Sequence, residues 1–367
     1  MKCKIQKIAA QNTGRIIAVS DIHGHAHYLE GVLKKVNFCA QDTLVIVGDM
    51  IEKGPESLKT VRCIMKLREE NPNVYAVMGN VDYWRLWQFY HDAPADFLGM
   101  LRWTKRVWED GFFLDILEEL GVRLDELTEE DMESLCGAIR SQFSEELDFL
   151  WNLPTVLSVG NYIFVHAGIP TDDLAALQNV DAGQCMKTDA FLTTADSFEK
   201  NVVVGHWPVY LYRDEDCVNP LFDGQRHIIS IDGGCGLRYG AQLNALIIPN
   251  PEADMGDVAY VAYDDYPVLI APAAQRAKEK TVLIRYFDCE AELLEDRGDI
   301  VRLRQISSGK EFIAPKNFLY ESDGPLCCGS ISDACLEIAV GDRLSVIEET
   351  SVGYIVKKDG LIGWYYK

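Results

Sequence analysis

Residues 15–24 read RIIAVSDIHG, an apolar run that stops at a loop containing an aspartate and a histidine. The same pattern returns in TLVIVGD at residues 43–49 and in VYAVMGN at residues 74–80. Segments with apolar residues at helical spacing, at residues 26–37 and 55–70, separate the three runs. Apolar strands that alternate with helices predict an α/β fold, whose parallel sheet is covered on both faces.

Polar residues follow each of these predicted strands, and two later apolar runs also end at a histidine. The carboxyl ends of parallel strands meet at one edge of a sheet, so we expect these side chains to lie together. The predicted metal ligands are Asp21, His23, Asp49, Asn80, His166 and His206. A mixed nitrogen and oxygen set suits Mn²⁺, Fe or Zn²⁺ better than Ca²⁺. We predict two divalent metal ions bridged by Asp49, a pair that can orient a phosphate and activate water.

The ordered motifs SDIHG, GDMIEKG, GNVD, VHAG and GHWP resemble those of the calcineurin-like metallophosphoesterases. Within that superfamily they are most similar to the bacterial branch of the phosphoprotein phosphatase family, over about residues 15–250. The resemblance implies a two-sheet αββα sandwich and a phosphorylated substrate, either a protein or a small molecule. It also implies two ligand groups: Asp21, His23 and Asp49 for one metal, and Asp49, Asn80, His166 and His206 for the other.

Three positions depart from the family pattern. The histidine expected as general acid is Val81, its carboxylate partner is Glu52, and the arginine that grips phosphate is Lys53. Valine cannot donate a proton, so Asp82 or Glu52 is predicted to act as the catalytic acid beside the metal-bridging Asp49. We assign Lys53 and His25 to substrate binding.

Three functions remain open at this point. The first is hydrolysis of a phosphate ester, with a phosphoprotein Ser/Thr phosphatase as one form. The second is hydrolysis of a phosphoanhydride or phosphodiester of the dinucleoside polyphosphate type, because such leaving groups need less protonation. The third is a catalytically weak, metal-holding interaction protein.

The chain of 367 residues exceeds what one core usually covers. We expect a metallophosphoesterase domain at residues 1–272 that contains a helical insertion or cap at residues 82–153. Residues 273–367 read as short strands and turns, typical of a small all-β module. This segment resembles an SH3-like barrel of the bacterial type, and a peptide is its expected partner.

The formal net charge is −22, without a run of Lys and Arg, which argues against a nucleic-acid surface. The sequence has no apolar run of about 18 residues and no secretory leader, so we predict no membrane association. Its eleven cysteines are scattered without CxxC spacing. Reduced thiols of this kind are typical of a cytoplasmic protein.

Overall fold

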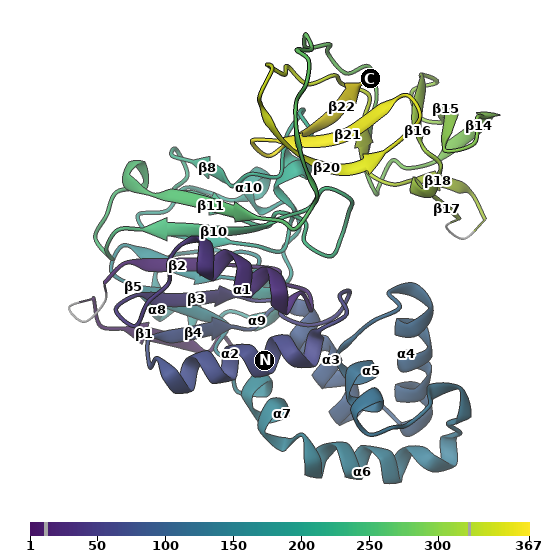
Figure 1. The fold of residues 1–367 in the computed structure, drawn as a ribbon. Coiled ribbons are helices and arrows are strands. Elements are labelled where there is room, and N and C mark those ends of the chain that lie inside the picture. The colour runs from purple at the N-terminus through teal and green to yellow at the C-terminus, as the bar shows by residue number, and fades with distance from the viewer. Residues whose placement is uncertain (11–13, 322–323) are drawn as a thin grey trace. The chain divides into compact units, whose positions relative to one another are not determined.

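The computed structural model describes residues 1–10, 14–321 and 324–367 (Figure 1). It divides into two compact units. Unit 1 comprises Met1–Val209, Pro220–Gly236 and Gln242–Tyr263, and unit 2 comprises Tyr210–Asn219, Leu237–Ala241 and Asp264–Lys367. Within these described ranges, no helix is both long enough and apolar enough to cross a membrane.

The first sheet of unit 1 has five strands in the order β11-β10-β2-β3-β4. The three predicted strands, β2 (Ile16–Val19), β3 (Thr43–Val47) and β4 (Val74–Val77), pair in parallel. Strand β10 (Leu243–Ile248) adds antiparallel to β2, and β11 (Ala259–Tyr263) adds antiparallel to β10. This order leaves the carboxyl ends of β2, β3 and β4 side by side.

Two helices connect the parallel strands of this sheet. Helix α1 (Ala26–Lys35) joins β2 to β3, and α2 (Ser57–Glu70) joins β3 to β4. Both helices lie against the same face of the sheet (Figure 1). Their apolar residues, such as Leu29 and Val61, are fully buried, as the helical spacing in the sequence predicts.

The second sheet of unit 1 has six strands in the order β1-β5-β6-β7-β9-β8. Strands β5 and β6 form a hairpin around Gly160 and pair antiparallel, whereas β7 pairs with β6 in parallel. The strands are β1 (Ile5–Ile8), β5 (Val156–Val159), β6 (Tyr162–Val165), β7 (Asn201–Val204), β8 (Leu221–Asp223) and β9 (Ile228–Ser230).

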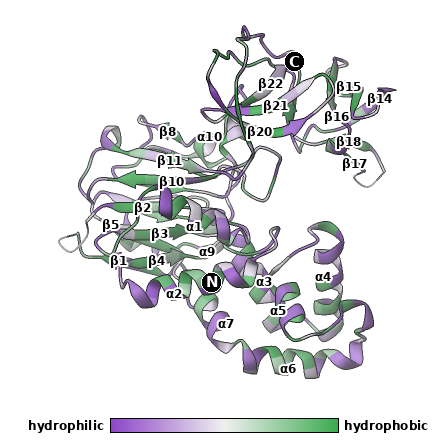
Figure 2. Ribbon diagram, in the orientation of Figure 1, coloured by the Kyte–Doolittle hydropathy of each residue, from purple (hydrophilic) through white to green (hydrophobic). Residues whose placement is uncertain are grey.

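One apolar core joins the two sheets of unit 1. Ile16, Val45 and Val77 of the first sheet belong to the same buried cluster as Phe164 and Val203 of the second. Figure 2 shows the hydrophobic colouring of these strands. Removing apolar side chains from water stabilises this arrangement by roughly 25 cal/mol per Å². The unit is therefore a mixed α/β domain with two packed sheets.

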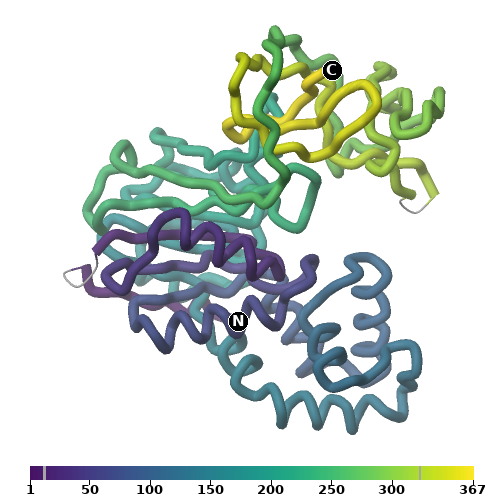
Figure 3. The backbone as a smooth tube through the Cα atoms, in the orientation of Figure 1, coloured from purple at the N-terminus to yellow at the C-terminus, as the bar shows by residue number. Residues whose placement is uncertain are grey.

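A run of helices replaces the strand and helix rhythm after β4, as predicted (Figure 3). Helix α3 begins at Asn80, two residues before the predicted start of the insertion. Its neighbours are α4 (Pro94–Val107), α5 (Phe112–Glu119), α6 (Met132–Gln142) and α7 (Ser144–Trp151), and α3 itself ends at His91. Shorter helices of unit 1 are η2 (Leu124–Glu126), η3 (Glu129–Asp131), α8 (Leu174–Leu177), α9 (Ala182–Met186), α10 (Phe191–Thr194) and η5 (Met255–Asp257).

Unit 2 consists mainly of short strands. A four-stranded sheet has the order β12-β20-β21-β22, and a three-stranded sheet has the order β14-β15-β16. Leu344, Val356 and Tyr365 pack in its core. The strands are β12 (Val268–Ile270), β13 (Leu283–Ile284), β14 (Ala291–Asp296), β15 (Ile300–Gln305), β16 (Glu311–Pro315), β17 (Leu319–Glu321), β18 (Leu326–Cys328), β19 (Ile331–Ser332), β20 (Arg343–Glu349), β21 (Gly353–Lys358) and β22 (Leu361–Tyr366). Two 3-10 turns are η4 (Val209–Tyr212) and η6 (Lys316–Phe318).

Candidate metal centre

The six predicted ligands, here called the ligand cluster, follow strand ends of both sheets in unit 1. Asp21 and His23 follow β2, Asp49 follows β3, and Asn80 follows β4 as the first residue of α3. His166 and His206 follow β6 and β7 of the second sheet. All but Asn80 and His206 are buried, and the side chain of His206 is 7% exposed. The structure thus brings together residues that are up to 185 positions apart in the chain.

The loops that carry these ligands are tightly wound. Asp21, His23, Asp49 and His206 all have φ between 45° and 63°, a conformation that non-glycine residues rarely adopt. Gly79 allows a close approach, because a Cβ atom there would lie 2.1 Å from Oδ1 of Asp49. Backbone strain of this kind is concentrated at functional sites, where the surrounding structure holds it in place.

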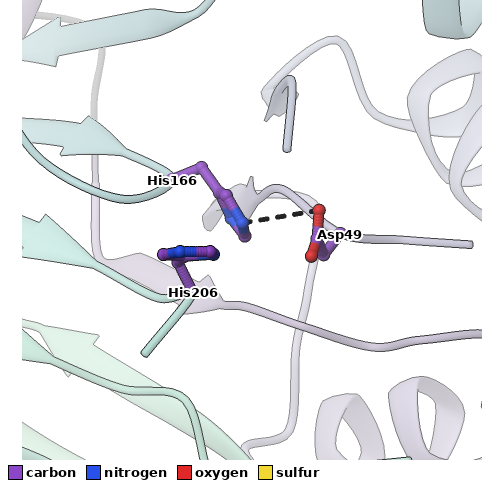
Figure 4. A group of neighbouring side chains, drawn as sticks. All are labelled: Asp49, His166 and His206. Carbon is purple, nitrogen blue, oxygen red and sulfur yellow. Dashed lines mark ion pairs between the residues drawn. The ribbon is translucent and has the colours of Figure 1, made fainter. Parts of the chain in front are cut away.

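Asp49 lies between two groups of candidate ligands. Its Oδ1 is 3.4 Å from Nε2 of His166, and its Oδ2 is 3.8 Å from Nε2 of His23. Asp49, His166 and His206 form one group, drawn in Figure 4, and Asp21, His23 and Asp49 form the other. Within each group the ligand atoms lie within 4.8 Å of one another. A carboxylate with one oxygen in each group can bridge two cations.

The side chain of Asn80 tests whether a cation fits the first group. Its inner amide atom is 3.1 Å from Nε2 of His166 and 2.8 Å from Nδ1 of His206. With its nitrogen inward the amide donates to both imidazoles, whereas with its oxygen inward, as a metal ligand requires, lone pairs face one another and a cation would stabilise them. Ligands held at about 2.1 Å from one metal ion lie about 3.0–3.4 Å apart, which matches these separations. The residues therefore fit a metal site.

Each imidazole is oriented by an acceptor behind it. Nδ1 of His166 donates to the carbonyl of Val47 at 2.9 Å, and Nδ1 of His23 faces the carbonyl of Ile51 at 3.2 Å. On His206 the order is reversed: Nε2 lies 2.8 Å from Oδ1 of Asp189, so Nδ1 faces the cluster. Such contacts fix the ring tautomer and turn the other nitrogen toward the cluster, where Nε2 of His23 faces Nζ of Lys53 at 3.2 Å.

The electrostatics of the cluster favour added positive charge. Burial opposes protonation of His166, but the charges of Asp49 and Asp21 outweigh it and raise the pKa of His166 to about 10. Burial raises the pKa of Asp21 to about 6, although His166 counteracts it. Burial acts the same way on Asp49, yet His166 and His23 hold the pKa of Asp49 below its usual range. Buried carboxylates of this kind are stabilised by nearby positive charge, and a divalent metal ion carries more positive charge than a proton.

Asp82, one of the two predicted acids, lies with both oxygens on backbone amides. Oδ2 accepts from Gly79 at 3.0 Å, and Oδ1 accepts from Met50 at 2.9 Å and Ile51 at 3.3 Å. The side chain is fully buried. Burial, with the charge of Asp49, raises the pKa of Asp82 to about 7. In this position Asp82 ties the loop after β3 to the start of α3.

Glu52, the other predicted acid, faces the helical insertion. Its Oε2 is 3.3 Å from Nε of Arg85, and its Oε1 accepts from the backbone of Phe112 at 3.2 Å. Gly111 lies against the carboxylate, where a Cβ atom would be 2.7 Å from Oε2. Burial raises the pKa of Glu52, whereas the guanidinium of Arg85 opposes that shift. The partner of Glu52 is thus an arginine on α3.

Lys53 and His25, the two residues assigned to substrate binding, differ in how they lie relative to the ligand cluster. Nζ of Lys53 is 3.2 Å from Nε2 of His23 and 5.6 Å from the ring of Trp108. Lys53 therefore extends directly over the ligand cluster. Nδ1 of His25 lies 2.6 Å from the carbonyl of His23 within its own loop, and burial lowers the pKa of His25.

Four residues around the site were not predicted from the sequence to take part in it. Asp189 orients His206, and Arg85 and Trp108 come from the helical insertion. Asp232 lies just after β9 and is fully buried, and its Oδ2 has no hydrogen-bond partner among the described residues. An arginine among aromatic residues in a predicted helix, as at Arg85, is a sequence signal that could have indicated a role at the site. The exposed aspartate at position 189 gives no such signal.

Comparisons with known proteins identify the family of this chain. The calcineurin-like phosphoesterase family matches residues 14–231. The asymmetrical bis(5'-nucleosyl)-tetraphosphatase PrpE of Anoxybacillus flavithermus is 24% identical over 261 residues, which are 64% of this chain and 90% of that protein. The symmetrical bis(5'-nucleosyl)-tetraphosphatase of Methylococcus capsulatus is 30% identical over 156 residues, 42% of this chain and only 43% of that protein. A solved Ser/Thr phosphatase structure of Saccharomyces cerevisiae aligns with 72% of this chain and with 85% of that chain. The sequence identity is 13% and the TM-score is 0.43.

Proposed function

Because the chain belongs to the calcineurin-like phosphoesterase family, we propose that it hydrolyses a phosphoanhydride bond in a small molecule of the dinucleoside polyphosphate class. That the chain is a metal-dependent hydrolase of phosphate bonds follows from the family itself. The bond and substrate class are our proposal. They are supported by Val81, a buried side chain with no proton to donate at the position of the family's acid, and by the activities in the names of two relatives.

The family uses a dimetal centre, and the ligand cluster fits one. We propose that Asp21, His23 and Asp49 hold one ion, that Asn80, His166 and His206 hold the other, and that Asp49 is shared. Mn²⁺, Fe or Zn²⁺ suits these nitrogen and oxygen ligands. Such a pair supplies Lewis acidity and a hydroxide nucleophile near neutral pH.

The chain's own residues supply binding and orientation. Asp49 keeps both ligand groups in register because its two oxygens face different imidazoles. Lys53 brings a positive charge next to His23, where it neutralises one oxygen of a bound phosphate. Unlike an arginine it cannot grip two oxygens at once, so its contribution is mainly electrostatic. Asp189 holds the ring of His206.

The second candidate is a phosphoprotein Ser/Thr phosphatase. The order of the family motifs favours it, and unit 2 offers a separate β-rich module. We propose that this module is SH3-like and binds peptide. Against this candidate stands Val81, because a serine or threonine alkoxide departs poorly without protonation.

The deciding experiment compares substrates with the full chain in Mn²⁺. Turnover of diadenosine tetraphosphate and p-nitrophenyl phosphate, with little release of phosphate from phosphoserine peptides, is the expected result. Efficient turnover of the peptides would support the second candidate instead. The variant D49N should lose Mn²⁺-dependent turnover of every substrate, since it removes the bridging charge. Equal turnover by D49N and the unaltered protein would exclude the site as the catalytic centre.

A further inference from the structure

The carboxylate of Glu52 has an unexpected partner. In the family pattern this position orients the acid histidine, which is Val81 here. Arg85 follows Val81 by one turn of α3, so the two side chains leave the helix on the same face. Nε of Arg85 lies 3.3 Å from Oε2 of Glu52, and the two side chains are 9% and 2% exposed. An arginine and carboxylate pair thus stands where a histidine and carboxylate pair is expected.

We propose that Arg85 stabilises the negative charge on the leaving-group oxygen, in place of a proton donor, and thereby restricts the enzyme to leaving groups that depart as stable anions. The inference rests on the proposed function, since it concerns the same reaction at the same site. A guanidinium stays charged across the working pH range, so it offers charge and hydrogen bonds but no proton.

Two indole rings, Gln88 and Glu52 surround the guanidinium, although its Nε makes no hydrogen bond to the carboxylate among the described residues. The guanidinium lies 4.8 Å from the ring of Trp108 and 5.5 Å from the ring of Trp103, and its Nη1 donates to Gln88 at 2.8 Å. Its other partner, Glu52, is fixed by the amide of Phe112. A donor that is fixed before the reaction stabilises developing charge most effectively, because no reorganisation is needed.

Trp108 connects this guanidinium to the ligand cluster. Its ring lies 5.6 Å from Nζ of Lys53, which in turn is 3.2 Å from Nε2 of His23. Two cations therefore share one indole ring beside the cluster. Among the described residues, Nη2 of Arg85 has no hydrogen-bond partner, so it can donate to an incoming oxygen. In this proposal Lys53, which contacts His23, meets the phosphate, and Arg85, on the same indole ring, meets the leaving group.

The chemistry balances without a proton donor. A water-derived oxygen forms a bond to phosphorus, the bond from phosphorus to the leaving oxygen breaks, and the electron pair departs with that oxygen. The proton of the attacking water passes to solvent. A phosphate released from an anhydride is stable as an anion, whereas a serine alkoxide is not. Arg85 therefore favours anhydrides and acidic phenols over alkyl esters.

The test is the dependence of kcat on leaving-group acidity for a series of aryl phosphates, together with diadenosine tetraphosphate, in Mn²⁺. We expect R85M to lower kcat for diadenosine tetraphosphate by about 10²-fold, the scale of one lost oxyanion donor, and to steepen the dependence. R85K should recover part of the loss. Mn²⁺ affinity should stay unchanged in each variant.

The double variant E52Q/R85M separates catalysis from simple charge balance. R85M leaves Glu52 buried without its cation, which can unfold the protein, whereas the double variant removes both charges. We expect E52Q/R85M to keep a low kcat and a steep dependence of kcat on leaving-group acidity. Recovery to the kcat of the unaltered protein would show that Arg85 only neutralises Glu52 and would overturn the inference. An unaltered protein that hydrolyses no substrate would overturn the proposed function and this inference with it.

Discussion

The backbone amide of Val81 donates to Oδ1 of Asp49 at 2.9 Å. The residue that replaces the family's acid therefore still helps to orient the proposed bridging carboxylate. Because the contact comes from the main chain, it does not depend on the side chain at position 81. This explains how the position can hold valine without disturbing the ligand cluster.

The first prediction concerns that side chain. V81H should bind Mn²⁺ as tightly as the unaltered protein and should hydrolyse alkyl phosphates about 10²-fold faster, the low end of what a general acid contributes. Steady-state kinetics with an alkyl and an aryl phosphate measure the change. V81A is the control, since it keeps the amide and adds no acid. A V81H protein with full metal content but no gain on alkyl phosphates would contradict the prediction.

The second prediction concerns Asp189, whose Oδ1 lies 2.8 Å from Nε2 of His206. D189A should weaken Mn²⁺ binding by about 10–100-fold, because the ring of His206 loses its orienting acceptor. Calorimetric titration of the metal-free protein measures the affinity directly. Asp172 is a matched control, since it accepts from the amides of Glu199 and Lys200, outside the ligand cluster. Equal affinities of D189A and D172A would argue against the role.

The third prediction separates two roles of Asp82. Its carboxylate accepts from three backbone amides, so D82N should lower the free energy of unfolding by about 1–3 kcal/mol. Urea denaturation of the metal-free protein measures this loss. Asp131 accepts similarly from Thr128 at an exposed helix start, and D131N should have a smaller effect. If D82N were fully stable and slow only on poor leaving groups, Asp82 would be the acid instead.

The fourth prediction concerns Asp115 on α5, which accepts from the amide of Leu58 at 2.9 Å. Burial, assisted by the charges of Asp110 and Glu52, raises the pKa of Asp115 to about 7, well above the unfolded value near 4. The folded state therefore binds this proton more tightly than the unfolded chain. Its contribution to stability is full below about pH 4 and is lost as the pH rises through about 7.

D115N keeps an acceptor for Leu58 and removes the charge. It should be more stable than the unaltered protein at pH 8, by on the order of 2 kcal/mol after allowance for partial exposure. The difference should shrink toward pH 4. Urea unfolding at pH 5 and pH 8 measures both values. An identical difference at the two pH values would show that the carboxyl does not titrate in this range.

The sequence allowed the ligand cluster to be predicted because each ligand lies within a few residues of a strand end. Asp21 and Asp49 need only a short apolar run and the rule that parallel strands end together. Arg85 and Glu52 could not be paired in this way, because their contact depends on how the insertion folds back. The amide of Phe112, 60 residues after Glu52, completes that contact. The spacing of apolar residues predicts which face of a helix is buried, but it does not predict which distant residue that face will meet.

Helix α3 has a consequence for regulation by metal supply. Its first residue, Asn80, belongs to the ligand cluster, and its second turn carries Arg85 against Trp103 and Trp108. A single helix therefore begins at the metal centre and continues into the insertion. Thermodynamic linkage is reciprocal. If metal loading shifts α3 and thereby changes the affinity of the insertion for another molecule, that molecule must change the affinity for the metal by the same factor. The insertion would then report metal occupancy to its surroundings.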